Sequence, residues 1–196
     1  MEKNELKELY YITPINNVSS IMQDGILSYK RMVQLPHDSL AMPVIQLRRT
    51  SILVPGGRPL HEYVNLYICA RNPMLFKLRA EYNQLCVLSV STEVLDLGGV
   101  IITDSNASSN YARFAPSPEG LHMVEREQTF AEDWTSSDQI DYWRRKAAKC
   151  AEVLVPDFIS SKYLCFAYAA TEEVKNKIQA LGIDLRIEID QHMFFM

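Results

Sequence analysis

The stretch KCAEVLVPDF, Lys149 to Phe158, sets one acid, Glu152, ahead of the apolar run Val153–Val155, and Pro156 closes the segment. An apolar, β-branched run bounded by proline predicts a short buried strand. A carboxylate on the first residue of such a strand is either a solvated end or a charge placed for chemistry. Taken in isolation, a strand-end glutamate more often faces water, so the surrounding sequence must decide.

Strand and helix patterns occur on both sides of this stretch. Apolar runs separated by turn residues predict strands at 9–13, 64–70, 85–90, 99–103, 163–168 and 185–189. Helical patterns predict short helices at 18–24, 91–99, 138–151 and 171–181, and single helical turns near 46–50 and after Pro156. No repeat or linker interrupts the chain, so we expect one domain over residues 1–196 with an α+β fold.

Local signals place the ends of these helices. Asn16 or Asn17 is the expected cap of the first helix, and Gly25 is the expected end. Asp138 begins the helical stretch DQIDYWRRKAAKCA. The apolar residues of that stretch fall on one stripe, which is typical of a helix that packs one face on a core: Ile140, Trp143 and Ala147.

Two long regions lack a sustained period. Residues 28–59 contain Pro36, Pro43 and a PGG turn, and residues 104–136 contain NASSN, APSPEG and many charges. Irregular segments of this length inside a domain are usually functional. We therefore expect binding or catalytic residues in both regions.

The composition excludes several classes of protein. With 196 residues, 47% hydrophobic and 22% charged, the chain has the make-up of an ordinary globular domain. The charged N-terminus MEKNELKELYY lacks a signal-peptide core, and no apolar run approaches the ~18 residues of a membrane span, which predicts a cytoplasmic protein. The four cysteines are widely spaced and predict reduced core thiols without zinc: Cys69, Cys86, Cys150 and Cys165.

The net charge of −4 argues against a protein that coats nucleic acid by bulk electrostatics. It does not exclude a short nucleic-acid site, because cations gather locally. One group comprises Arg144, Arg145, Lys146 and Lys149, and another comprises Arg71, Lys77 and Arg79. Such groups of cations more commonly belong to solvated helix and strand faces than to a nucleic-acid site.

Familiar catalytic motifs are missing from the sequence. There is no phosphate-binding glycine loop, no GxSxG and no HExxH, so hydrolases, nucleoside triphosphatases and zinc peptidases lack their required parts. His61 and His192 are isolated histidines, which are usually packed or surface residues.

The order of several motifs nevertheless resembles the DarT family of bacterial DNA ADP-ribosyltransferase toxins. The most specific block is LHEYVNLYICARNPMLF at 60–76, similar to a family block with Leu-His-Asp-Tyr-Val-Pro before an aromatic strand. Supporting matches are YYITPINNVSSIMQDGILS, QLRRT, ITDSNAS and RRKAAKCAEVLV, in the family's order along nearly the whole chain. Here Glu62 stands for the family's Asp, Asn65 for its Pro, and QHMFFM for a Trp-Tyr ending.

The resemblance implies an ADP-ribosyltransferase fold, in which short strands form a split sheet around an NAD cleft flanked by helices. It also implies that NAD is the co-substrate, that no metal is used, and that Glu152 is catalytic. Departure of nicotinamide places positive charge on the ribose, which a carboxylate stabilises most in the transition state. The same carboxylate can take the proton of the attacking base.

The resemblance also assigns residues that bind the cofactor. Arg49 matches the arginine of QLRRT, where it is expected to act on the NAD pyrophosphate and in catalysis, and its neighbour Arg48 is the alternative. The family usually has a histidine followed by a hydroxyl residue on its first strand. The remaining expected cofactor contacts are Tyr11, which replaces that histidine, Thr13, Asn17 and Tyr67, which is expected to stack on nicotinamide.

Four further residues lie in segments that resemble the DNA-contacting parts of the family: Arg71, Met74, Asn106 and Arg113. Asn106 stands where some members have histidine, and Met74 is equally well explained as a core methionine. Stacking surfaces and phosphate contacts are what single-stranded DNA requires.

The resemblance therefore predicts a bacterial toxin that transfers ADP-ribose to a base of single-stranded DNA, thymine in the best-known branch, and that is countered by an antitoxin of the DarG type. Two alternatives stay open. One is transfer to guanine, RNA or protein. The other is a degenerate member that binds NAD or nucleic acid without turnover, which the changes at Tyr11 and Asn106 motivate.

Overall fold

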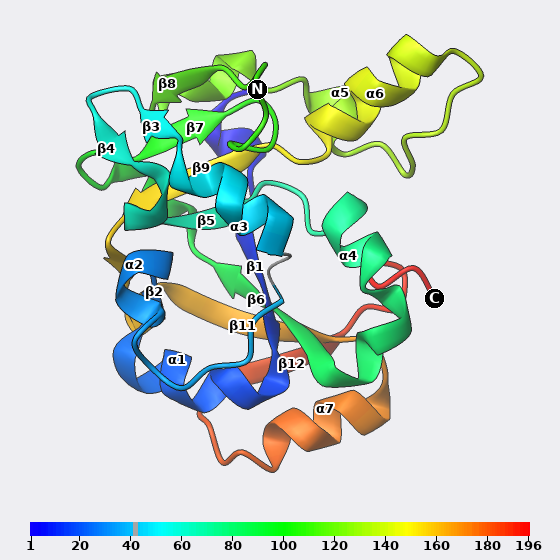
Figure 1. Ribbon diagram of the computed structural model, residues 1–196. Helices are drawn as coiled ribbons and strands as arrows, with labels where there is room; N and C mark the ends of the chain where they lie inside the picture. The colour runs from blue at the N-terminus through cyan, green and yellow to red at the C-terminus, as the bar shows by residue number, and fades with distance from the viewer. Residues whose placement is uncertain (41–42) are drawn as a thin grey trace.

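An eight-stranded sheet runs through the computed structural model, which describes residues 1–40 and 43–196 (Figure 1). All neighbouring strands are antiparallel except β11 and β12, which are parallel. In spatial order the strands are β12 (Arg186–Ile189), β11 (Leu164–Ala169), β6 (Leu85–Val90), β1 (Leu9–Pro14), β5 (Tyr63–Tyr67), β9 (Glu152–Pro156), β7 (Ile101–Thr103) and β8 (Phe114–Pro116).

The sheet is split at its middle. β1 pairs with β6 along its whole length, from Leu9 opposite Val90 to Pro14 opposite Leu85. Its pairing with β5 on the other side is a single pair, Tyr10 with Tyr67. The two halves of the sheet are therefore joined at one point and diverge from it. The predicted α+β class and split sheet are confirmed.

Short helices and ribbons surround the sheet. Figure 1 places α1 and α7 at its lower end and α5 with α6 at the upper right, while α3 and α4 lie in front of it. The helices are α1 (Val18–Asp24), α2 (Tyr29–Met32), α3 (Pro43–Thr50), α4 (Pro73–Lys77), α5 (Arg126–Thr129), α6 (Gln139–Ala148) and α7 (Glu172–Gln179). Two ribbons pair β2 (Ile26–Leu27) with β10 (Phe158–Ile159), and β3 (Leu53–Val54) with β4 (Arg58–Pro59).

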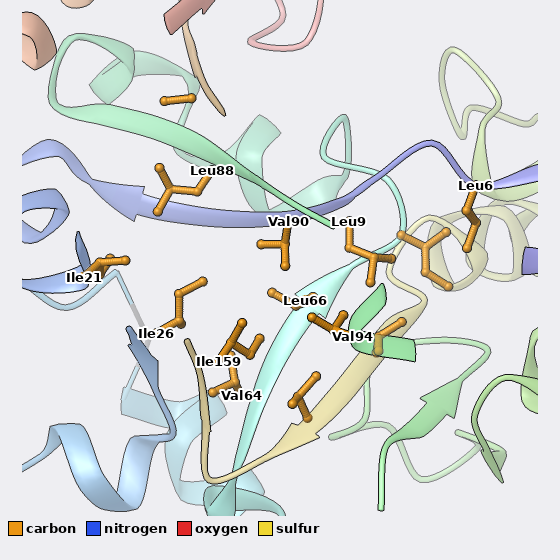
Figure 2. Close-up of a cluster of buried hydrophobic side chains, with 14 of the residues drawn as sticks. Leu6, Leu9, Ile21, Ile26, Val64, Leu66, Leu88, Val90, Val94 and Ile159 are labelled. Atoms are coloured by element: carbon orange, nitrogen blue, oxygen red, sulfur yellow. The ribbon is translucent and has the colours of Figure 1, made fainter. Parts of the chain in front are cut away.

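The sheet is covered on both faces, as strand β6 shows best. All six residues of β6 are buried, and successive side chains point to opposite faces. Leu88 and Val90 join the large cluster shown in Figure 2, which also holds Leu9 and Leu66. Leu85 and Val87 join a second cluster across the sheet. Both faces therefore hold the central strands in fixed positions, which gives the site a rigid base.

Side-chain caps fix several helix starts, but not the first one. Asp138 accepts from the backbone of Asp141 at the start of α6, as predicted. Asn17 does occupy the cap position of α1, as predicted, but its side chain makes no capping bond and instead binds the backbone of Asp38. Gly25 does end α1, with a φ of +81°, and a Cβ there would lie 2.3 Å from the carbonyl oxygen of Ile159.

Other predictions differ from the structure in extent. Helix α3 has eight residues rather than one turn. The chain after Pro156 forms strand β10 before a 3₁₀ turn at Ser161–Tyr163, because β10 pairs with β2. The apolar stripe of α6 does not face the core, since its residues are exposed: Ile140, Trp143 and Ala147.

The four cysteines are free thiols, as predicted. Cys69 and Cys86 are buried and Cys150 is partly buried, but Cys165 is exposed, so it is not a core thiol. Among the described residues, no helix is long and apolar enough to cross a membrane.

Candidate active site

A cleft of about 420 Å³ lies where β1 and β5 diverge. Its walls come from β1, β5, α3, α4 and the segment around Asp38. Aromatic rings and polar groups share the lining, which includes Tyr11, Tyr63, Tyr67, Asn65 and Arg49. Mixed linings of this kind, at volumes of about 300–1,000 Å³, are typical of small-molecule sites.

Glu152 lies directly behind the lining of this cleft, in contact with Arg49 and Asn106, which both line it. It is the first residue of β9 and stands opposite Tyr67 of β5 on one side and Thr103 of β7 on the other. Its side chain is fully buried. Because it is held between two paired strands, its backbone has no freedom to carry the carboxylate to the surface. The glutamate is therefore a placed charge and not a solvated strand end.

Three groups contact the Glu152 carboxylate. Asn106 donates from Nδ2 to Oε1 at 3.0 Å, and the backbone N–H of Ala107 donates to Oε2 at 3.3 Å. Arg49 Nη1 lies 3.6 Å from Oε2. The Asn106 amide is itself oriented, because its Oδ1 accepts from the Ser108 backbone N–H at 2.9 Å and so leaves Nδ2 toward the glutamate.

The pKa of Glu152 is raised above its ordinary value. Burial is the largest cause, and Arg49 and the Ala107 N–H act in the opposite direction without cancelling it. A carboxylate with a raised pKa beside a cleft is ionised at neutral pH only at an energetic cost, and it binds a proton more readily than a solvated glutamate. These properties suit both charge stabilisation and proton transfer.

Arg49 is the cation of the cleft that meets Glu152. It lies on α3 and is 6% exposed, whereas its neighbour Arg48 is exposed. The geometry therefore favours Arg49 over Arg48 as the residue that meets a ligand. Gln46, three residues earlier and on the same side of α3, lies 3.0 Å from the His61 ring through its Oε1.

His61 links α2 and α3 to the strand that bears Tyr67. Its ring packs on Tyr29 with 4.3 Å between centroids, and its Nε2 meets Gln46. Burial and the charge of Arg49 lower its pKa, so the ring is neutral at pH 7. An isolated histidine in the sequence gave no sign of this contact, which depends on α3 folding back over the start of β5.

The other expected cofactor residues all line the cleft. Burial raises the pKa of Tyr11 to about 12, so its phenol stays protonated and can donate a hydrogen bond. Thr13 is 2% exposed and lies 3.5 Å from Asn17 through its Oγ1. Tyr67 donates to the sulfur of Met74 at 3.0 Å, which fixes its ring against α4.

The expected DNA-contacting residues divide into two pairs. Met74 and Asn106 line the cleft. Arg71 instead donates to the carbonyls of Glu132 and His192 and lies over the Phe195 ring at 4.0 Å. Arg113 is 62% exposed and binds Asp104 at 2.5 Å. The structure thus brings only the first pair to the cleft, and the DNA role of all four stays a prediction.

Sequence reasoning missed several residues of the lining. Tyr63 and Asn65 follow from the strand pattern, since they alternate with Val64 on the face that carries Tyr67. Lys146 and Cys150 come from the end of α6. Among residues 1–40 and 43–196 no group of three His, Cys, Asp or Glu side chains could hold a metal ion.

Comparisons with known proteins identify relatives of this architecture. A family model described as "ssDNA thymidine ADP-ribosyltransferase, DarT" matches residues 10–195. A DNA ADP-ribosyl transferase–DNA ADP-ribosyl glycohydrolase fusion protein of Thermosipho africanus is 30% identical over 97% of this chain, which spans 50% of that protein. Its structure with ADP-ribose, DarTG, superposes with a TM-score of 0.84 at 29% identity, covering 96% of this chain and 51% of that one.

A second relative shares the fold along its whole length. DarT of Thermus sp. 2.9 in complex with ADP-ribosylated ssDNA gives a TM-score of 0.83 at 23% identity, and covers 97% of both chains. Its complex with NAD+ gives 0.80 at 21% identity, covering 97% of this chain and 98% of that one. Since the family model matches nearly all of the sequence, this chain belongs to the DarT family of DNA ADP-ribosyltransferases.

Proposed function

We propose that this chain transfers the ADP-ribosyl group of NAD to a thymine base in single-stranded DNA, and that residues 1–196 act as one catalytic domain. The observation that carries this function is the buried carboxylate of Glu152 beside Arg49, a residue that lines an aromatic cleft. Membership in the DarT family supports the choice of substrates, as do the ligands of the Thermus relative, NAD+ and ADP-ribosylated ssDNA.

The cleft residues fit NAD chemically. The planar fork of Arg49 suits two oxygens of a pyrophosphate, and its burial strengthens such a contact. Tyr67 lines the cleft and offers a ring on which nicotinamide can stack. Tyr11 and Thr13 offer hydroxyls to a ribose, in place of the histidine that the family usually carries at the first of these positions.

Glu152 performs the central step. Bound NAD supplies the ADP-ribosyl group, and its ribose gains positive charge as nicotinamide departs. The ionised Glu152 carboxylate stabilises this charge more in the transition state than in the ground state, because the charge develops only there. Asn106 and Ala107 hold both carboxylate oxygens in place by hydrogen bonds, so little reorganisation is needed during the reaction.

The same carboxylate also serves the acceptor. A base nitrogen that forms a new bond to the ribose must lose its proton, and Glu152 can accept it. The raised pKa of Glu152 lies closer to neutral pH than the pKa of a solvated glutamate, so Glu152 is the better proton acceptor of the two. One residue thus supports the departure of nicotinamide and the attack of the base.

Transfer to DNA is toxic to the cell that makes the enzyme, and we therefore propose a partner that reverses or blocks it. The Thermosipho relative joins a transferase and a glycohydrolase in one chain, which supports a DarG-type antitoxin for this protein as well. Both DNA and NAD are available in the bacterial cytoplasm, where the four free thiols also remain reduced, and we propose that compartment.

The covalent product tests this function directly. Purified protein is incubated with NAD and a panel of single-stranded oligonucleotides, each lacking one of the four bases, and the products are analysed by mass spectrometry. We expect one ADP-ribosyl group on every oligonucleotide that contains a suitable thymidine context, and none on those without thymidine. Modification of thymidine-free strands identifies another acceptor. Absence of product from the whole panel, with NAD binding intact, identifies a member without turnover.

Asn106→Asp is expected to lower the rate at pH 7 by about 10- to 100-fold. The substitution replaces a donor 3.0 Å from Glu152 with a second carboxylate, and like charges raise the pKa of the pair. Because the reaction needs ionised Glu152, the acid limb of the pH–rate profile should move to higher pH. The profile of initial rates measures this shift.

Two further variants control this experiment. Asn110→Asp makes the same charge change on an exposed position of the same loop and should keep the wild-type profile. Asn106→Ala removes the donor without adding charge and should cause a smaller shift in the same direction. If Asn106→Asp follows the Asn110→Asp profile, Asn106 does not control the ionisation of Glu152.

A further inference from the structure

Helix α6 turns an apolar stripe toward solvent. Ile140 is 65% exposed and Trp143 is 61% exposed, and Ala147 is exposed as well. Their spacing of three and four residues places them on one face of the helix. Figure 1 shows α6 at the upper right, beside α5 and away from the covered faces of the sheet. We call Ile140, Trp143 and Ala147 the α6 stripe.

The α6 stripe borders the active-site cleft. Lys146 lies on α6 three residues after Trp143, and it lines the cleft together with Cys150 just beyond the helix end. Side chains three residues apart are neighbours on a helix surface. Lys146 Nζ also lies 3.2 Å from the Tyr142 hydroxyl, which holds it along the helix. Trp143 therefore lies within reach of a strand that leaves the cleft past Lys146.

Positive charge accompanies the stripe. Arg144 follows Trp143 directly and is exposed, and no ion pair is found for it among the described residues. Arg145 is paired with Asp141 at 2.7 Å. An exposed indole beside guanidinium groups is the combination that holds single-stranded nucleic acid, since bases stack on the ring and phosphates meet the cations.

The small area of the stripe favours DNA over a protein partner. Stable protein interfaces bury about 1,200–2,000 Å² in total. The α6 stripe offers three side chains in a single row, of which one is aromatic. A nucleotide base needs only one aromatic face, so a single exposed indole is sufficient for it.

We propose that Trp143 is a stacking platform for a nucleotide that flanks the modified base in single-stranded DNA, with the exposed Arg144, the next residue of the helix, available for a phosphate. The proposal rests on single-stranded DNA as the substrate. It adds a contact outside the cleft, which makes affinity depend on the length of the strand beyond the reacting thymidine.

Binding of labelled oligonucleotides without NAD tests the platform. For a thymidine-containing strand of about 12 nucleotides, Trp143→Ala should weaken affinity by about 5- to 100-fold, because one base–aromatic stack is lost. For a strand of about 4 nucleotides the same variant should bind like wild type. Trp143→Phe keeps a ring and should restore most of the lost affinity. Phe158→Ala removes another exposed ring, 45% exposed on β10, and should change neither affinity.

Intrinsic fluorescence supplies a second readout. The chain has two tryptophans, and Trp134 is only 8% exposed. The long strand should quench the emission of wild-type protein, and this quenching should be lost in Trp143→Phe. Equal affinity of wild type and Trp143→Ala for the long strand overturns the proposal. Loss of binding in Trp143→Ala supports it even if no oligonucleotide is modified, in which case the proposed reaction fails and the platform stands.

Discussion

Glu152→Gln is expected to lower the rate of ADP-ribosyl transfer by at least about 100- to 1,000-fold, the loss typical when one electrostatic group of an active site is removed. Glutamine has nearly the same shape, but its single carbonyl oxygen can accept from Asn106 or from the Ala107 N–H and not from both, since these two donors meet different oxygens of the glutamate. What it lacks is the negative charge that faces the electron-poor sugar. The affinity for NAD should change little, because the charge acts mainly in the transition state.

The measurement combines single-turnover rates with NAD binding by calorimetry. Glu152→Asp is the matched variant, since it keeps the charge but draws it back by one methylene from the Asn106 amide and the cleft. It should retain more activity than Glu152→Gln and still fall below wild type. Thermal melts show whether each protein folds. A Glu152→Gln protein that folds, binds NAD and transfers at the wild-type rate removes Glu152 from the mechanism.

The sheet was predictable from the sequence because most of its strands are apolar runs bounded by turn residues. The run Val153–Val155 forms the core of β9, and Leu85–Val90 forms β6 without adjustment. Because both faces of the sheet are covered, such strands are nearly continuous apolar runs in the sequence. Glu152 and Arg49 came from the family resemblance, and the structure adds that the two side chains meet at 3.6 Å.

Contacts between segments that are far apart in the chain could not be predicted from the sequence. The sequence predicted a helix cap at Asn17, but its side-chain amide forms hydrogen bonds with the backbone of Asp38, 21 residues away. Asn106 was expected to meet DNA, and its partner in the structure is Glu152, 46 residues away. A polar side chain can form hydrogen bonds of similar strength with local and with distant partners. Its position in the sequence therefore does not determine which partner it binds.

The prediction that the apolar stripe of α6 packs on the core was wrong for a different reason. Its period is that of a buried helix face, and Trp143 is a residue type that usually lies inside. A period identifies which side chains share a face, but it does not say what covers that face. A surface for a ligand and a surface for a core therefore give the same pattern, and only the fold separates them.

Arg49→Ala is expected to weaken NAD binding by about 10- to 100-fold, because a buried guanidinium contact to phosphate is charge-assisted. The rate should fall further at neutral pH. Arg49 lies 3.6 Å from the Glu152 carboxylate and lowers its pKa against the effect of burial. Without Arg49 that pKa rises higher, so a smaller fraction of Glu152 is ionised at pH 7. The acid limb of the pH–rate profile therefore moves to higher pH.

Arg48→Ala and Arg49→Lys separate the two effects of Arg49. Arg48 is exposed on the same helix, so its loss should leave both NAD affinity and the profile unchanged. Arg49→Lys keeps the positive charge but not the planar fork, so it should restore the position of the acid limb while NAD binding stays weak. If Arg48→Ala weakens NAD binding instead, the pyrophosphate contact belongs to Arg48. If Arg49→Ala leaves the acid limb in place, the cation and the carboxylate act independently, and their proximity serves only to keep two buried charges neutral as a pair.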